Sequence, residues 1–117
     1  IFPGTKWCGI GNIASSYDDL GWLSSTDKCC RQHDFCKPEI ISGETKYNLT
    51  NDGIGTRKGC ECDEEFRNCL FKTKCFSAYG IGEIFFSDIL NNYCLRCTHN
   101  GSESNDSRNE KNYFFAS

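Results

Sequence analysis

Three residues of this sequence could carry acid–base or metal chemistry: His33, Asp34 and Asp63. An imidazole that hydrogen-bonds a carboxylate is a common general base, because the carboxylate fixes the tautomer and stabilises the protonated ring. A second carboxylate beside inward-facing backbone carbonyls forms an oxygen-only ligand set, which suits Ca²⁺ better than zinc. Gly9 and Gly11 permit a loop with such carbonyls. The sequence therefore holds the parts of a base and of a calcium site.

Four of the ten cysteines show how these parts could be positioned. Cys29 and Cys36 are seven residues apart, as are Cys62 and Cys69. Seven residues span nearly two helical turns, roughly 10.5 Å of rise, so each pair lies on one face of a helix. Two antiparallel helices with this pattern can be joined by two disulfides, Cys29–Cys69 and Cys36–Cys62.

The doubly joined helices would place His33 opposite Asp63, within about one turn across the gap. Asp34 points to another side of the first helix, one turn beyond Cys30. If Cys30 pairs with Cys8, the glycine loop around Cys8 is tied beside the Asp34 carboxylate. No EF-hand motif occurs, so a calcium site would have to be assembled in this way.

The first of the two helices is expected over residues 26–37. Ser25 or Thr26 can cap its N-terminus, and Asp27 suits the positive end of the helix dipole in the first turn. Pro38 ends it, because the residue before a proline is forced out of the helical region.

The remaining elements complete a mainly α fold of two antiparallel disulfide-stapled helices with a calcium-binding loop, a third helix and a small β-hairpin. The second helix is expected over 59–72, with acidic residues at its start and lysines at its end. Residues 38–58 form a loop or hairpin, and a third helix runs from 81 to about 92. We expect one domain over 1–97 and a polar, mobile tail over 98–117.

Composition narrows the class of protein. The chain has 117 residues, a net charge of −3 and a pI near 5.3, which argues against nucleic-acid binding. No run of about 18 apolar residues is present, so a membrane-spanning helix is excluded. Ten cysteines with only two histidines fit disulfides in an oxidising compartment better than zinc. We therefore expect a secreted, extracellular protein.

Two further sequence features bear on secretion. Residues 1–11 lack the basic start and long apolar stretch of a signal peptide, so we interpret the chain as a mature form. Glycosylation sequons occur at Asn48, Asn100 and Asn105, and Asn48 is the better glycan candidate because the other two lie in the Asn- and Ser-rich tail.

Three motifs, WCGIGN, CCRQHDFC and CECDEEF, resemble those of group III secreted phospholipases A2, the bee- and scorpion-venom type. The resemblance covers residues 1–97. It implies Ca²⁺-dependent hydrolysis of the sn-2 ester of glycerophospholipids at lipid interfaces, which releases a free fatty acid and a lysophospholipid. It also implies a venom component that works on phospholipid membrane surfaces or micelles.

The resemblance implies a role for each matching residue. His33 would be the base that takes a proton from water, and Asp63 would orient it. The Gly9 amide would help to stabilise the oxyanion. The calcium ligands would be Asp34 and the backbone carbonyls of Trp7, Gly9 and Gly11. The disulfides would be Cys8–Cys30, Cys29–Cys69, Cys36–Cys62 and Cys60–Cys94.

The sequence departs from the family in two places. The family's third helix supplies a tyrosine hydroxyl to the catalytic aspartate, whereas residues 83–86 here read Glu-Ile-Phe-Phe. Cys75 and Cys97 lack counterparts in the bee-type pattern. They can pair with each other, or one can bridge to a disulfide-linked small chain cut from the C-terminal region; an uncut chain is equally consistent with the sequence.

Other functions remain open from the sequence. A toxin or receptor ligand could use the same scaffold for binding, and a structural calcium module would need Asp34 but not His33. Ile1, Phe2, Trp22 and Leu23 could rim the active site and enter a lipid interface, or they could cap the core. The net charge of −3 indicates that strong attraction to anionic lipids does not drive binding.

Overall fold

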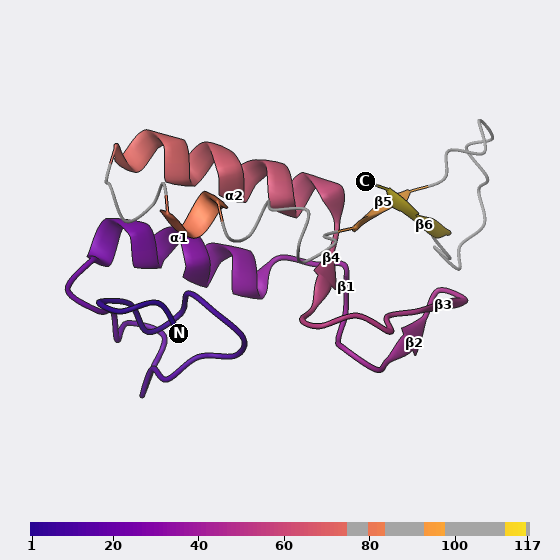
Figure 1. The fold of residues 1–117 in the computed structure, drawn as a ribbon, viewed down its shortest axis with the longest axis horizontal. Coiled ribbons are helices and arrows are strands. Elements are labelled where there is room, and N and C mark those ends of the chain that lie inside the picture. The colour runs from indigo at the N-terminus through magenta and orange to yellow at the C-terminus, as the bar shows by residue number, and fades with distance from the viewer. Residues whose placement is uncertain (75–79, 84–92, 98–111, 117) are drawn as a thin grey trace.

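Two antiparallel helices, α1 (Ser24–Phe35) and α2 (Cys60–Thr73), lie side by side and form the centre of the molecule (Figure 1). The computed structural model describes residues 1–74, 80–83, 93–97 and 112–116. Disulfides join the helices at both expected positions, with Cα–Cα distances of 5.6 Å for Cys29–Cys69 and 5.8 Å for Cys36–Cys62. The register predicted from cysteine spacing is therefore confirmed.

The helix ends differ slightly from the prediction. α1 begins two residues earlier than expected and ends two residues earlier, because Cys36 already has extended backbone with ψ 136°. Leu23 stands at its N-cap without a side-chain cap hydrogen bond, so the predicted cap by Ser25 or Thr26 is wrong. α2 lies one residue later than expected and ends at Thr73; its C-cap, Lys74, has the left-handed φ of 50°.

A small hairpin follows α1, as the sequence predicted. The residues at its turn, Tyr47 and Asn48, have φ values of 53° and 59°. Two consecutive left-handed residues match the twist of the flanking strands in a two-residue hairpin loop. Four short strands form two antiparallel pairs, β1 (Glu39–Ile40) with β4 (Arg57–Lys58) and β2 (Thr45–Lys46) with β3 (Leu49–Thr50).

The end of the chain returns to the body as a strand. β6 (Tyr113–Ala116) pairs antiparallel with β5 (Cys94–Cys97), and the Tyr113 ring lies edge-on to Tyr47 with centroids 4.6 Å apart. The structure thus differs from the expected mobile tail at these four residues, which pair in a sheet; Phe114 is exposed and the other three are half-buried. The rest of that tail, residues 98–111 and 117, lies outside the described residues.

Other expectations fall partly outside the described residues. Residues 80–83 are helical, in agreement with the start of the expected third helix, but 84–92 are not described. The effect of the missing tyrosine hydroxyl on Asp63 and the pairing of Cys75 therefore stay predictions. The disulfide Cys60–Cys94, which the resemblance implied, is present and links α2 to β5.

The buried core lies where the N-terminal loop meets the two helices. Ile81, from the short helical segment, packs into the same core. Three of its seven residues are disulfide-bonded cysteines, as expected of a small disulfide-rich domain. No helix in the described part of the chain is long and apolar enough to cross a membrane. The core residues are Trp7, Cys8, Cys29, Cys30, Phe66, Leu70 and Ile81.

Candidate active site

The structure brings His33 of α1 and Asp63 of α2 together. The His33 Nε2 atom lies 2.9 Å from Asp63 Oδ1. The side chains are 9% and 16% exposed, so water screens the interaction weakly. The contact depends on the two disulfides, which fix the helices in the register that places the two side chains face to face.

The ring of His33 is also held by packing. Phe66, one turn beyond Asp63 on α2, stacks on the imidazole with ring centroids 4.5 Å apart and an interplanar angle of 24°. Phe66 is itself buried in the core. The imidazole therefore has one face against an aromatic ring and one nitrogen on a carboxylate, which together define its orientation.

The Asp63 contact also defines the tautomer. When Nε2–H donates to Asp63, the lone pair of the neutral ring is on Nδ1, and Nδ1 is the atom that can accept a proton. If the ring becomes protonated, the carboxylate faces a positive charge at hydrogen-bond distance. This is the arrangement of a general base with a supporting carboxylate.

Asp34 follows His33 and occupies a half-buried position near other charges. Burial raises the pKa of Asp34 to about 7; the positive charge of Lys58 opposes this rise, and the carboxylates of Glu39 and Asp27 add to it. A carboxylate in such surroundings lacks the solvation that its charge requires. A cation beside it would supply the missing stabilisation.

Lys58 is a feature that the sequence analysis missed. It is 5% exposed, and its Nζ donates to the carbonyls of Asp34 and Cys36 and to Glu39 Oε2, at 3.0, 3.1 and 2.7 Å. An ammonium group has three protons, so all are used. Lys58 thus satisfies carbonyls at the end of α1 that have no partner within the helix. No local sequence pattern marks it.

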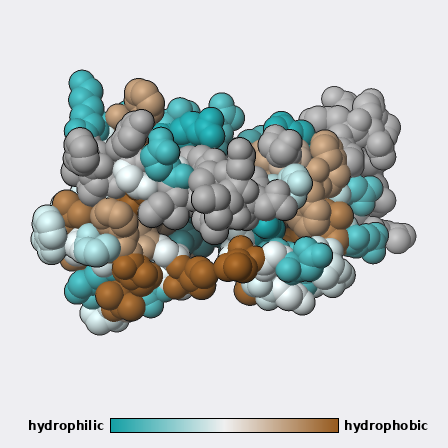
Figure 2. Space-filling view, in the orientation of Figure 1, coloured by the Kyte–Doolittle hydropathy of each residue, from teal (hydrophilic) through white to brown (hydrophobic). Residues whose placement is uncertain are grey.

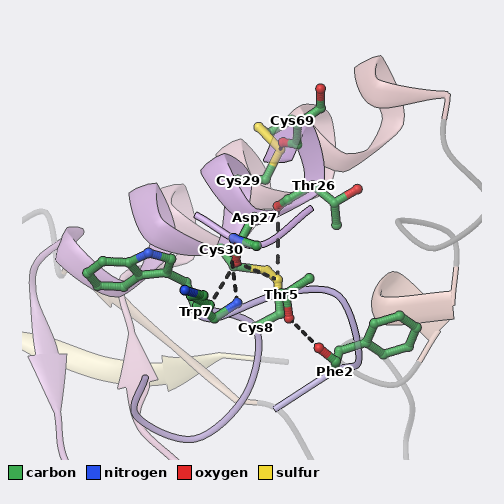
Figure 3. The surroundings of a disulfide bond; sticks show 12 residues. Phe2, Thr5, Trp7, Cys8, Thr26, Asp27, Cys29, Cys30 and Cys69 are labelled. Carbon is green, nitrogen blue, oxygen red and sulfur yellow. Dashed lines mark hydrogen bonds between the residues drawn. A yellow bond between two sulfur atoms is a disulfide. The ribbon is translucent and has the colours of Figure 1, made fainter. Parts of the chain in front are cut away.

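The loop that contains Gly9 and Gly11 is fastened to α1 beside Asp34. The Cys8–Cys30 disulfide is present with a Cα–Cα distance of 5.1 Å (Figure 3). Cys30 is one helical turn before Asp34. The Trp7 ring also packs on Phe35, the neighbour of Asp34, with centroids 5.7 Å apart. The loop is therefore attached to α1 at Cys30 and packs on Phe35, the residues one turn before and one position after Asp34.

The backbone of this loop leaves oxygen atoms available. Gly9 and Gly11 have φ of 149° and 69°, a region that glycine enters readily. The carbonyl of Cys8 accepts from the Phe2 amide at 2.8 Å. Within the described residues, the carbonyls of Trp7, Gly9 and Gly11 accept no hydrogen bond, and the Gly9 N–H donates none. In the described part of the chain, the three expected ligand carbonyls and the expected oxyanion donor thus have no hydrogen-bond partner.

The fold is a small disulfide-rich scaffold, and its His33–Asp63 pair has the geometry of a general base with a supporting carboxylate. Comparison with known proteins agrees, since the phospholipase A2 family profile matches residues 1–98. Phospholipase A2 of Apis dorsata is 45% identical over 100 residues, which cover 85% of this chain and 74% of that protein. The chain therefore belongs to the phospholipase A2 family, a class of enzymes.

Two other relatives differ in how much of them the chain covers. Phospholipase A2 of Xylocopa appendiculata circumvolans is 48% identical over 101 residues, 85% of this chain and 55% of that protein. Phospholipase A2 phaiodactylipin of Anuroctonus phaiodactylus is 59% identical over 70 residues, 60% of this chain and 43% of that protein. The chain thus spans about half the length of these two relatives.

Proposed function

We propose that the protein hydrolyses the sn-2 ester of glycerophospholipids at a lipid surface, with Ca²⁺ as its cofactor. The products are a free fatty acid and a lysophospholipid. The observations that carry the proposal are the His33 Nε2–Asp63 contact of 2.9 Å and the carbonyls of Trp7, Gly9 and Gly11, which accept no hydrogen bond within the described residues. Membership of the phospholipase A2 family supports the same substrate class.

His33 performs the proton transfers. Nδ1 takes a proton from water as the water oxygen attacks the ester carbonyl carbon, and the carbonyl π electrons move to its oxygen. Asp63 stabilises the imidazolium that forms, through Nε2–H. When the tetrahedral intermediate collapses, the ester C–O bond breaks and Nδ1 returns the proton to the leaving glycerol oxygen. No covalent enzyme intermediate is required.

The residues around the loop fit a calcium ion. Asp34 supplies a carboxylate with a raised pKa, and the carbonyls of Trp7, Gly9 and Gly11 are unused within the described residues. This donor set contains oxygen alone, as Ca²⁺ prefers. When bound, the ion would polarise the ester carbonyl as a Lewis acid. The Gly9 N–H is the donor for the developing oxyanion.

A lipid surface is the proposed partner. Figure 2 shows apolar residues gathered over the N-terminal segment, at the lower left of the view. In this segment Trp22 is 81% exposed and Ile10 is 77% exposed. Exposed tryptophan and aliphatic side chains favour the membrane interface. Of the four residues considered earlier, Trp22 and Ile1 are exposed, whereas Phe2 packs against the core and Leu23 is half-buried.

The proposal includes secretion and a role as a venom component. The four disulfides in the described residues require an oxidising compartment to form and persist. A small chain cut from the C-terminal region and linked through a cysteine stays a prediction. Mass spectrometry of the native protein before and after reduction tests it, because a second chain would separate only after reduction.

Positional analysis of the products tests the proposed reaction. Vesicles of a phosphatidylcholine with different acyl chains at sn-1 and sn-2 are incubated with the protein in Ca²⁺ or in EGTA. The proposal expects release of the sn-2 fatty acid alone, and only with Ca²⁺. Release from sn-1, or equal release in EGTA, would contradict it.

A further inference from the structure

Asp27 in the first turn of α1 is a fully buried carboxylate, with 0% exposure, at the junction between the helix and the glycine loop. Both of its oxygens accept hydrogen bonds from the backbone. Oδ2 accepts from the N–H groups of Lys6 and Gly21, at 2.9 and 2.8 Å. Oδ1 accepts from the Trp7 N–H at 2.9 Å (Figure 3). One side chain thus holds two segments of the N-terminal region.

The same turn of the helix also carries the covalent attachment of the loop. Cys30 is one turn from Asp27 and bonds Cys8, and the Cys8 sulfur lies 3.7 Å from Asp27 Oδ1. Trp7 and Cys8 are therefore fixed to neighbouring points on α1, one by a carboxylate and one by a disulfide. Asp34 lies a further turn along the same helix.

These contacts concern the backbone whose oxygens are the proposed ligands. Trp7 donates its N–H to Asp27, while the carbonyl of the same residue is unused within the described residues. Holding the amide restricts rotation of the Trp7 backbone and so limits the directions in which its carbonyl can point. Preorganised ligands bind a metal more tightly, because less ordering remains to be done on binding.

We propose that Asp27 is a positioning residue for the calcium site: it fixes the loop in its binding conformation before the ion arrives. The inference rests on the proposed function, because it assumes that this loop binds Ca²⁺. Asp27 would not touch the ion. It would act through the amides of Lys6, Trp7 and Gly21, which it holds.

The carboxylate is needed because both oxygens accept. In Asp27→Asn one oxygen becomes an NH₂ group, which can only donate. In one orientation the NH₂ faces the Trp7 N–H, and in the other it faces the N–H groups of Lys6 and Gly21. Either way at least one buried N–H loses its acceptor and meets a donor.

Direct measurement of Ca²⁺ affinity tests the proposal. Calorimetric titration of Ca²⁺ into the full chain is expected to show binding to Asp27→Asn weakened about 10- to 100-fold, the usual effect of removing a group that supports a ligand. Asp18→Asn, the same change at an exposed position of the same region, should retain the wild-type affinity. Equal affinity of the Asp27 variant and the wild type would overturn the proposal.

A stability control separates positioning from a general loss of structure. Leu95→Ala removes a buried side chain from β5, outside the core cluster that contains Trp7 and Cys8, and should lower the melting temperature. Below that temperature it should bind Ca²⁺ like the wild type. If Leu95→Ala weakened binding as much as Asp27→Asn, the effect would be one of stability and the proposal would be wrong.

Hydrogen exchange on the wild-type chain needs no variant, so it serves if Asp27→Asn does not fold. Without Ca²⁺, the amides of Lys6, Trp7 and Gly21 should already exchange slowly. Exchange at the rate of an open loop, with protection only after Ca²⁺ is added, would overturn the proposal. A wild-type chain that binds no Ca²⁺ would instead contradict the proposed function itself, so the two failures can be distinguished.

Discussion

Replacing Asp63 by asparagine isolates the contribution of the carboxylate to the base. The side chain keeps its size, but the negative charge that faces His33 Nε2 at 2.9 Å is lost. Asparagine can still accept from Nε2–H through its oxygen, so the ring can stay in place. What disappears is the charge that stabilises the imidazolium as water is deprotonated.

The size of the effect follows from the geometry. A hydrogen bond to a charged group contributes about 1.5–3 kcal/mol. Both side chains have low exposure, 9% and 16%, so water screens this interaction only weakly. With about 1.36 kcal/mol for each tenfold change in rate, the loss corresponds to about 10- to 150-fold in kcat. KM should change little, because Asp63 acts on His33 rather than on the lipid.

The assay is release of fatty acid from mixed micelles of phosphatidylcholine at saturating Ca²⁺, with kcat and KM determined separately. Glu64→Gln is the matched control, since Glu64 is the exposed neighbour on the same helix and the change removes one charge as well. It should retain the wild-type kcat. If Asp63→Asn were as active as Glu64→Gln while both were folded, the assignment of His33 and Asp63 as a catalytic pair would be refuted.

Three further predictions concern stability, pH and modification. Replacing Cys36 and Cys62 together by alanine removes a disulfide with a sequence separation of 26. The chain-entropy model predicts that the free energy of unfolding falls by about 3.5 kcal/mol. Urea denaturation measures this loss, and an unchanged unfolding midpoint would contradict it. The pKa of Asp34 is raised from its ordinary 3.8 to about 7. Between these two pH values and without Ca²⁺, the folded state holds a proton on Asp34 that the unfolded state has lost, so the free energy of unfolding should fall as the pH rises from about 4 to about 7. Denaturation in EGTA at pH 5 and pH 8 should show this fall in the wild type and a smaller one in Asp34→Asn; an equal fall in both would exclude Asp34 as the cause. Asn48 is exposed at the turn of the hairpin, so protein from secretory cells should carry a glycan there. Enzymatic deglycosylation converts a glycosylated asparagine to aspartate, so peptide mapping should find aspartate at position 48, and unmodified asparagine in all of the protein would refute the prediction.

The sequence predicts the helical centre of the fold well because the signal there is local. Cysteines seven residues apart must share a helix face, and two such faces have a single antiparallel register that joins both pairs. The proximity of His33 and Asp63 follows from that register alone, without knowledge of the loops. The hairpin at 45–50 was likewise visible in its short extended run between turn residues.

The contacts that support the site could not be found in this way. Asp27 was expected to serve its own helix end, whereas its oxygens accept from Lys6, Trp7 and Gly21 of segments that fold over the helix. Lys58 reaches from β4 to the end of α1. Such contacts join parts of the chain that no periodicity relates, and they appear only when the segments are packed together.

The most direct test of the account is fatty-acid release from phospholipid vesicles by the wild type and by His33→Gln, each with Ca²⁺ and with EGTA. We predict release by the wild type in Ca²⁺ alone and a loss of about 10²- to 10⁴-fold in the variant, the usual contribution of a general base. Calcium binding should be retained in the variant. A folded His33→Gln protein with wild-type activity would contradict the account, and a wild type that binds Ca²⁺ but releases no fatty acid would favour a binding protein on the same scaffold.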